Sequence, residues 1–300
     1  PYAEKEADGF RQVIEAAGGE CIIKSPEKAT ADAQIPLIQS LISQEVDAIA
    51  IASNDVNALT ACLQDAMNEG IKVLSLDSNV VPEARQTFVN QAGVNEIGQA
   101  LADAVYDISG GSGEFAILSA SSQSANQNSW IDAMKAVMED DKYKDLDLVE
   151  VAYGDDEPQK STDQTQALLS KYPDLKVICS PTTVGINAAA KVIQDSESPV
   201  KLTGLGLPSE MSAYIGDDDS SPCPYMFLWN PEDVGKLSAY TAIALVDGTI
   251  TGAVGDTFDA GDMENSPYTI QECSDGGSEI ILGPPYKFDP SNIDEWKDVY

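Results

Sequence analysis

The chain has 300 residues, of which 50 are acidic, 17 are basic and none is histidine, so its formal net charge at pH 7 is −33. This charge repels phosphate backbones and leaves no basic face for nucleic acid, while the spread of acidic residues along the chain indicates a hydrated surface. The lack of imidazole excludes Ser-His-Asp and Cys-His catalysis and most zinc sites, and no apolar run approaches the roughly 20 residues of a membrane span.

The first part of the chain alternates helix-like and strand-like segments. In chain order, the hydrophobic spacing predicts a helix at residues 3–17, a strand at 20–24, a helix at 33–44, a strand at 47–53, a helix at 55–70, a strand at 72–77 and, after the segment 86–91, a helix at 95–108. The first recognisable element is a helix where this alternation requires a strand, so we expect a first strand that precedes residue 1. Residues 1–10 also lack the features of a signal peptide, so we expect any export signal to lie outside the sequence.

A Gly- and Ser-rich break at residues 109–113 precedes a second series of the same kind, and we interpret this break as a hinge. The series comprises strands at 114–120, 147–154, 176–180, 201–206 and 225–229, and helices at 127–139, 162–172, 184–194 and 231–248. The tail, residues 279–296, contains one more strand and a pair of prolines.

This order predicts an α/β fold with two doubly wound parallel-sheet lobes joined by a multi-strand hinge. We expect an N-terminal lobe from residues 1–110 plus 230–273, and a C-terminal lobe from residues 111–229 plus 274–300. Two lobes joined in this way open and shut around a ligand.

Signs of enzyme chemistry are few. There is neither a G-x-x-x-x-G-K-[ST] loop nor a G-x-G-x-x-G fingerprint after a strand, so nucleotide phosphates have no cradle. Acidic clusters at 139–141, 155–156 and 217–219 fall in loops or at helix ends, where hydrated charges are a better interpretation than a glycosidase pair. The sequence therefore predicts a protein that is not an enzyme and that has no cofactor and no metal site.

The five cysteines show no C-x-x-C pair and no metal-ligand spacing. Cys62 and Cys179 lie in apolar helix and strand patterns, which indicates buried thiols. Cys223 and Cys273 lie in loop-like sequence, where either a disulfide or two free thiols is compatible with the pattern.

Polar residues follow several predicted strands at the point where each strand ends. These residues are Asp77, then Asn126 to Asn128, then Pro181 with Thr182 and Thr183, and finally Trp229 with Asn230. In an open parallel sheet the ligand crevice lies beyond the carboxyl ends of the strands. A carboxylate, amides, a hydroxyl and an indole face are the groups that hold a small polyol, so this pattern predicts a sugar site.

Structural roles are alternatives for each of these residues. Asp77 can bind the amides of its own loop, and Asn126 can cap the helix that follows it. Thr182 and Thr183 can likewise cap the helix that begins near residue 184. Trp130 is expected to be a core residue, because it lies one turn into its helix.

The segments "VDAIAIASNDVNALTACLQDAMNEGIKVLSLDSN", "SSQSANQNSWIDAMK", "VICSPTTVGINAAAKVI" and "FLWNPEDVGKLSAY" carry a resemblance. The chain resembles type I periplasmic-binding-protein-like sugar-binding proteins of ABC importers, within the branch that holds the autoinducer-2-binding (Lsr) and rhamnose-binding proteins. By motif, the resemblance implies ligand contacts at Asp77, Asn126, Gln127, Pro181 and Thr183. Asn126 replaces an aspartate of the family pattern and Thr183 replaces an alanine, which leaves the pocket polar but changes its contacts.

The resemblance implies an extracytoplasmic solute-binding protein, in the periplasm or as a cell-surface lipoprotein, that captures autoinducer-2 or a related small sugar. It further implies a monomer that delivers this ligand to an ABC permease. Two alternatives of the same fold stay open: a receptor for rhamnose or another monosaccharide, and the sugar-sensing core of a LacI-type regulator. A regulator needs a basic helix-turn-helix, and the acidic chain has none.

Overall fold

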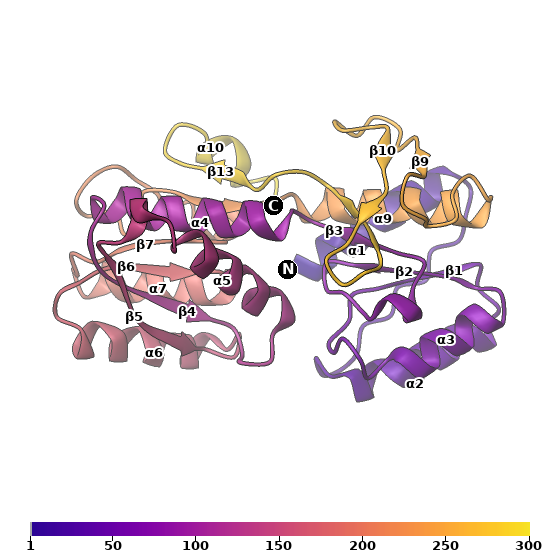
Figure 1. Cartoon of the computed structure of the whole chain (residues 1–300), viewed down its shortest axis with the longest axis horizontal. Helices are drawn as coiled ribbons and strands as arrows, with labels where there is room; N and C mark the ends of the chain where they lie inside the picture. The colour runs from indigo at the N-terminus through magenta and orange to yellow at the C-terminus, as the bar shows by residue number, and fades with distance from the viewer. Residues whose placement is uncertain (1) are drawn as a thin grey trace. The chain divides into compact units, whose positions relative to one another are not determined.

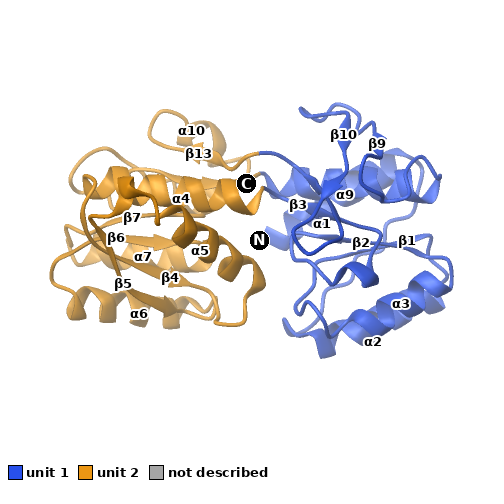
Figure 2. Cartoon of the chain, viewed as in Figure 1, with its two compact units in different colours: residues 1–92, 230–283 blue, residues 93–229, 284–300 orange. Residues whose placement is uncertain are grey.

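The computed structural model describes residues 2–300, and the chain forms two compact units (Figure 2). Unit 1 contains the chain up to Ala92 together with Asn230–Gly283. Unit 2 contains Gly93–Trp229 together with Pro284–Tyr300. No helix among residues 2–300 combines the length and the apolar character that a bilayer span requires.

Unit 1 is a sheet covered by helices on both faces. Its helices are α1 (Tyr2–Ala16), α2 (Ala31–Ser43), α3 (Thr60–Asn68) and α9 (Pro231–Val246), with a 3-10 turn η1 (Pro82–Ala84). Its strands are β1 (Ala48–Ile51), β2 (Lys72–Leu76), β3 (Thr87–Asn90), β9 (Thr257–Phe258), β10 (Tyr268–Thr269), β11 (Gln271–Glu272) and β12 (Ser278–Ile281).

The main sheet of unit 1 has the order β1-β2-β3-β12-β11, in which the first four strands are parallel and β11 is antiparallel to β12. Helices α1 and α9 lie on one face of this sheet, and α2 and α3 lie on the other (Figure 1). Because helices cover both faces, β3 is buried along its whole length and β2 is buried at every residue after Lys72. The short strands β9 and β10 form a separate ribbon.

Helices α1 and α9 pack backbone to backbone at two glycines. A Cβ atom on Gly9 would lie 2.0 Å from the carbonyl oxygen of Glu232, and a Cβ on Gly235 would lie 1.9 Å from that of Glu6. Only glycine fits at either position, because real Cβ contacts are never this short. This crossing fixes where the first turns of α1 lie in unit 1.

Unit 2 repeats the layered plan. Its helices are α4 (Val94–Ser109), α5 (Ala125–Val137), α6 (Pro158–Lys171), α7 (Thr183–Asp195), α8 (Pro208–Met211) and α10 (Ile293–Trp296), with a 3-10 turn η2 (Asp141–Tyr143). Its strands are β4 (Gly113–Ser119), β5 (Leu146–Tyr153), β6 (Leu175–Ser180), β7 (Lys201–Gly204), β8 (Met226–Leu228) and β13 (Tyr286–Phe288). The sheet β5-β4-β6-β7 is all parallel, with α4 on one face and α6 and α7 on the other, and β8 pairs with β13.

The predicted α/β class with two parallel sheets is confirmed, but one predicted strand is wrong. Residues 20–24 lie outside every described helix and strand, and Ile22 and Ile23 are 37% and 38% exposed. The apolar pattern of this segment is suited to a strand, but a strand forms only where a neighbour supplies backbone hydrogen bonds. No described strand pairs with it.

The division into units differs from the predicted domains at two segments. Helix α4 belongs to unit 2, because it packs on α5 so closely that a Cβ on Gly98 would lie 2.7 Å from Ala133. The Gly- and Ser-rich residues 109–113 therefore form the turn from α4 to β4 inside unit 2, with Gly110 as the left-handed C-cap, rather than a hinge. Residues 274–283 belong to unit 1, since β12 is hydrogen-bonded to β3.

All five cysteines, each within the described residues, are free thiols. Cys62 and Cys179 are buried, as predicted. Cys223 and Cys273 are also buried free thiols. Of the two alternatives that the sequence allowed, a disulfide or two free thiols, the structure contains the second.

Candidate functional site

Asp77 lies directly after β2, at the carboxyl end of the sheet of unit 1. Its backbone is in the left-handed region, with φ of +56°, which is uncommon for a residue with a side chain. Its N–H donates to the carbonyl of Val89 on β3, and the N–H of Ser78 turns back to the carbonyl of Leu76. Such a conformation costs of order 1–3 kcal/mol and is concentrated at functional sites, so it supports a functional role for this carboxylate.

Two hydroxyl groups donate to the carboxylate of Asp77. The phenol of Tyr2 lies 3.2 Å from Oδ1, and the hydroxyl of Ser78 lies 3.2 Å from Oδ2. Burial raises the pKa of Asp77 to about 6, although both hydrogen bonds act in the opposite direction. The group therefore titrates near neutral pH.

Glu6 is a second carboxyl group in this part of unit 1. It is only 4% exposed, and its Oε1 atom has no hydrogen-bond partner among the described residues. Burial raises the pKa of Glu6 well above its usual value, and the charge of Asp77 raises it further, while a hydrogen bond with Tyr2 acts against both. Unit 1 thus gathers two carboxyl groups and a phenol where α1 meets the end of β2.

Neither Tyr2 nor Glu6 was predicted as a site residue. Both lie in α1, so they do not follow a strand. One feature of the sequence could have identified Glu6: it is an acidic residue at helical spacing from Gly9 and Val13, on the face of the helix that is buried.

In unit 2, Asn126 and Gln127 lie in the first turn of α5, beyond the end of β4. The N-cap of α5 is Ser124, so Asn126 does not have the capping role that was its alternative. Both side chains are partly exposed, and the backbone carbonyl of Asn126 accepts a hydrogen bond from the hydroxyl of Ser129 across 2.7 Å. Asn128 is tied into the preceding loop by a hydrogen bond to Ser122.

Pro181, Thr182 and Thr183 join the end of β6 to the start of α7. Thr182 occupies the N-cap position but makes no capping hydrogen bond through its side chain. Its hydroxyl instead donates to Oδ1 of Asp156, which follows β5 and has a left-handed φ of +53°. Thr183 is the first residue of the helix and is partly exposed.

Asp156 belongs to one of the acidic clusters that sequence reasoning treated as hydrated surface. Desolvation of its carboxyl group raises its pKa, the hydrogen bond from Thr182 lowers it, and the charge of Asp155 raises it again. The residue is exposed in part, but its carboxylate is tied to the segment that contains Pro181 and Thr183. Asp156 is therefore an additional candidate for the site.

The two indole rings of unit 2 pack on each other rather than standing open. Trp130 and Trp229 are each 5% exposed, with ring centroids 5.6 Å apart at an interplanar angle of 62°. Trp130 is a core residue, as predicted, and Trp229 is packed into the same cluster. In unit 1, the side chain of Asn230 accepts from the N–H of Glu232 and caps α9.

Each unit therefore presents polar side chains at the carboxyl end of its own parallel sheet, which is where ligands bind in open α/β sheets. Unit 1 supplies Asp77 with Tyr2, and unit 2 supplies Asn126, Gln127, Thr183 and Asp156. Within residues 2–300, no group of three or more Cys, Asp or Glu side chains is arranged to hold a metal ion. The expectation that residues of the two halves bind one ligand stays a prediction.

Comparisons with known proteins show the family of the chain. A family model described as "Periplasmic binding protein domain" matches residues 1–250. A solved ABC transporter solute binding protein from Clostridium phytofermentas, with bound L-rhamnose, is 59% identical, with a TM-score of 0.95 over 100% of this chain and 95% of that one. A sugar ABC transporter protein from Actinomyces odontolyticus is 36% identical, with a TM-score of 0.83 over 99% of this chain and 93% of that one.

Two more distant likenesses carry less weight. LsrB from Clostridium saccharobutylicum, solved in complex with AI-2, has a TM-score of 0.84 over 98% of this chain and 95% of its own, but at 19% identity this shows the fold alone. The D-ribose/D-allose-binding protein of Pseudomonas aeruginosa is 26% identical over 186 residues, which are 59% of this chain. The match spans about half, 54%, of the length of that curated relative.

Proposed function

Because the chain belongs to the family of periplasmic binding protein domains, as its resemblance predicted, we propose that it is the receptor for L-rhamnose, or a closely related monosaccharide, of a sugar ABC importer. The observation that carries this proposal is the 59% identity, over the whole chain, to a solute binding protein that holds L-rhamnose. The expectation of autoinducer-2 as first ligand is replaced, because the likeness to the AI-2 complex is one of fold only.

The chemistry of the candidate residues supports a monosaccharide. A carboxylate such as that of Asp77 accepts hydrogen bonds from two neighbouring hydroxyl groups, as it already does from Tyr2 and Ser78. The amides of Asn126 and Gln127 each donate and accept, and the hydroxyl of Thr183 does both. These groups can recognise a polyol by hydrogen bonding alone, so we propose binding rather than catalysis.

We propose that the protein works outside the cytoplasm as a monomer, anchored as a lipoprotein or free in the periplasm, and hands its sugar to a membrane permease. The ligand would act by its differential affinity for a closed form of the two units, which shifts the population toward that form. A regulator of the LacI type is the alternative, and the gene sequence tests it: a signal peptide upstream of residue 1 would favour the importer, and a DNA-binding helix pair there would favour the regulator.

A ligand panel tests the proposal. L-rhamnose, D-ribose, D-xylose, D-galactose and autoinducer-2 would each be added in a thermal-shift assay, followed by titration calorimetry of the active ones. A ligand that binds only the folded form stabilises it by about 2.7 kcal/mol at a hundredfold excess over its Kd, so L-rhamnose is expected to give the largest rise in melting temperature. A shift with autoinducer-2 alone would overturn the choice of ligand, and no shift with any sugar would overturn the function.

Two variants test the residues. Asp77→Ala is expected to abolish the shift without unfolding the protein, and Gln127→Ala is expected to weaken binding less, because an amide makes neutral hydrogen bonds whereas the carboxylate makes charge-assisted ones. NMR of the recovered sugar distinguishes a receptor, which returns its ligand unchanged, from an enzyme.

A further inference from the structure

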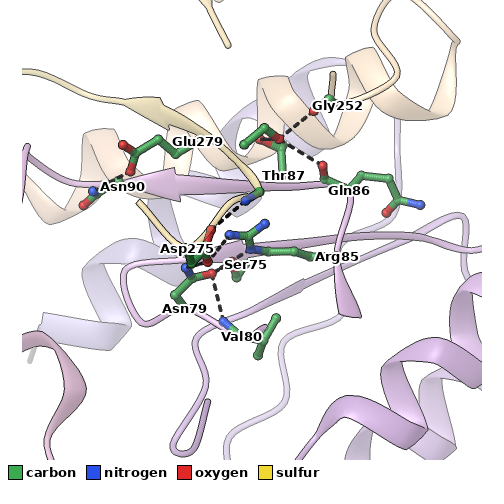
Figure 3. A network of polar contacts seen from close by, with 12 residues as sticks. Ser75, Asn79, Val80, Arg85, Gln86, Thr87, Asn90, Gly252, Asp275 and Glu279 are labelled. Atoms are coloured by element: carbon green, nitrogen blue, oxygen red, sulfur yellow. Dashed lines mark hydrogen bonds and ion pairs between the residues drawn. The ribbon is translucent and has the colours of Figure 1, made fainter. Parts of the chain in front are cut away.

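Arg85 is an almost fully buried cation in unit 1, close to the turn that contains Asp77. Its side chain is 1% exposed and makes two charge-assisted contacts (Figure 3). One Nη atom donates to Oδ2 of Asp275 across 2.7 Å, and Nε donates to Oδ1 of Asn79 across 2.7 Å. Arg85 thus joins Asn79, just after β2, to Asp275, which lies 196 positions after Asn79 in the chain.

Asn79 is where this network meets the turn. Besides Arg85, its Oδ1 accepts from the hydroxyl of Ser75 across 2.8 Å and from the N–H of Val80 across 2.9 Å. Its Nδ2 donates to Oδ2 of Asp275 across 3.0 Å. Ser75 precedes Asp77 by two residues and Asn79 follows it by two, so the network contacts the turn on both sides of Asp77.

Asp275 is itself held in the tight turn between β11 and β12. Its Oδ1 accepts the N–H of Gly277 across 2.9 Å, and the N–H of Cys273 donates to the carbonyl of Gly277 across 2.9 Å. A Cβ on Gly277 would lie 2.6 Å from Nη1 of Arg85, so the guanidinium lies directly against this turn. The anion that holds Arg85 is therefore part of a rigid local structure.

This network is formed by residues other than the candidate ligand groups of unit 1, and two of its members, Ser75 and Asn79, flank the residue with the left-handed φ. A conformation of that kind persists only when its surroundings impose it. The hydrogen bonds that Oδ1 of Asn79 accepts from the hydroxyl of Ser75 and from the N–H of Val80 hold the turn, in addition to the backbone bond from Asp77 to Val89.

We propose that Arg85 and Asp275 are positioning residues for Asp77: their ion pair fixes Asn79, and Asn79 fixes the turn that presents the Asp77 carboxylate to the sugar. This inference rests on the proposed function, because it assigns these residues a part in sugar binding. It predicts that sugar affinity depends on a charge in the β11–β12 turn that does not touch the sugar.

The test compares Asp275→Asn with a matched control, Ser278→Ala. Asn at 275 keeps the size of the side chain but removes the charge that holds Arg85. Ser278 is also buried in this corner, where its hydroxyl bonds the carbonyl of Gly252 across 2.6 Å and the hydroxyl of Thr87 across 3.1 Å, but it has no bond to residues 75–80. Both variants are expected to lower the melting temperature.

Two measurements separate positioning from a structural role. In calorimetry with L-rhamnose, Asp275→Asn is expected to lose at least tenfold in affinity, whereas Ser278→Ala keeps the wild-type value. In hydrogen exchange without sugar, the N–H groups of Asp77 and Val80 are expected to exchange at least tenfold faster in Asp275→Asn only. If Asp275→Asn does not fold, Asn79→Ala serves instead, because this variant keeps the ion pair of Arg85 with Asp275 and removes the side chain that connects the pair to the turn.

The outcomes are distinct. Wild-type affinity together with wild-type exchange in Asp275→Asn, or in Asn79→Ala, overturns the positioning role. Equal losses of affinity in Asp275→Asn and Ser278→Ala overturn it as well, since the effect would then be one of general stability. If the wild-type protein binds no sugar, the proposed function fails, and the exchange rates still decide whether the network holds the turn.

Discussion

The phenolic hydroxyl of Tyr2 donates to Oδ1 of Asp77 across 3.2 Å, which ties the first turn of α1 to the carboxyl end of β2. Glu6 lies one helical turn further along α1 and is buried on the same side of the helix. Two acids and a phenol therefore share a poorly solvated corner of unit 1. Charge in that corner is costly without a ligand, and this cost leads to the first two predictions.

Asp77→Asn is expected to stabilise the sugar-free protein at pH 8. The pKa of Asp77 is about 6 when folded, against an ordinary value of 3.8, so the folded state keeps a proton that the unfolded state releases between these values. The contribution of Asp77 to the free energy of unfolding is therefore fully present below about pH 4 and is lost as the pH rises through about 6. For a half-buried group this loss is about 1–3 kcal/mol. Urea unfolding at pH 4 and pH 8 measures the difference.

The control for this prediction is Asp65→Asn, on the exposed side of α3. It removes the same charge from an exposed position and is expected to change the free energy of unfolding by less than about 0.5 kcal/mol. If Asp77→Asn has the same free energy of unfolding as the wild type at pH 8, the ionised carboxylate of Asp77 does not destabilise the folded state.

The affinity for the sugar is expected to fall at acid pH. Hydroxyl groups of a sugar donate more strongly to an ionised carboxylate than to a neutral one, so binding favours deprotonated Asp77. Affinity should be level above about pH 7 and fall by up to tenfold per pH unit below about 6. Burial, and the charge of Asp77, also raise the pKa of the neighbouring Glu6.

Calorimetry between pH 4.5 and 8 with L-rhamnose measures this profile, within the range in which the protein stays folded. Gln127→Ala is a suitable control, since it lowers affinity at every pH but keeps the break in the profile. A flat profile in the wild-type protein would argue against Asp77 as an acceptor for the ligand.

The fold followed well from sequence because buried strands and amphipathic helices have periods that are read locally. The limits of elements were less accurate where a side chain redirects the backbone. Helix α3 was predicted from residue 55 but begins at Thr60, because the carboxylate of Asp55 accepts the N–H groups of Asn57 and Ala58 and holds them in a turn. Helix α6 begins earlier than predicted, at Pro158, whose fixed φ suits a first turn.

The candidate site was predictable only where its residues follow a strand. Asp77, Gln127 and Thr183 were predicted in this way, since strand ends mark the ligand edge of a parallel sheet. The bond between Thr182 and Asp156 joins residues 26 positions apart, and the ion pair of Arg85 with Asp275 joins residues 190 apart. No local pattern shows such pairings, because the topology of the sheets brings the partners together.

Gly235→Ala is expected to destabilise unit 1 and to weaken sugar binding. The new methyl group would lie 1.9 Å from the carbonyl oxygen of Glu6, so α1 must move away from α9 and take Tyr2 with it. Overpacking of this kind costs typically about 1–3 kcal/mol. Thermal unfolding and titration with L-rhamnose measure the two effects.

Gly248→Ala, at the end of the same helix α9, is the control. Its φ of +80° makes alanine unfavourable by about 1 kcal/mol, but a Cβ there meets nothing within 4 Å. It should lower stability and leave sugar affinity unchanged. Equal affinities in the two variants would mean that the position of α1 does not matter for binding.

Thr182→Val tests the role of Asp156 in unit 2. The substitution keeps the shape of the side chain and removes the hydroxyl that donates to Asp156. Water then hydrates the carboxylate instead. Because the lost hydrogen bond lowers the pKa of Asp156, its removal raises that pKa further. The loss of stability is expected to be about 1 kcal/mol, because much of Asp156 is exposed and water replaces the lost donor. The released loop is expected to reduce sugar affinity about tenfold, a change of about 1.4 kcal/mol.

Thr165→Val is the matched control in the same unit. Thr165 is fully buried in α6, and its hydroxyl donates to the carbonyl of Ser161 across 2.8 Å rather than to a carboxylate. Its replacement should cost a similar amount of stability, measured by urea unfolding, with no change in affinity measured by calorimetry. If both valine variants bind L-rhamnose as the wild type does, the hydrogen bond between Thr182 and Asp156 serves stability alone, and Asp156 is removed from the candidate site.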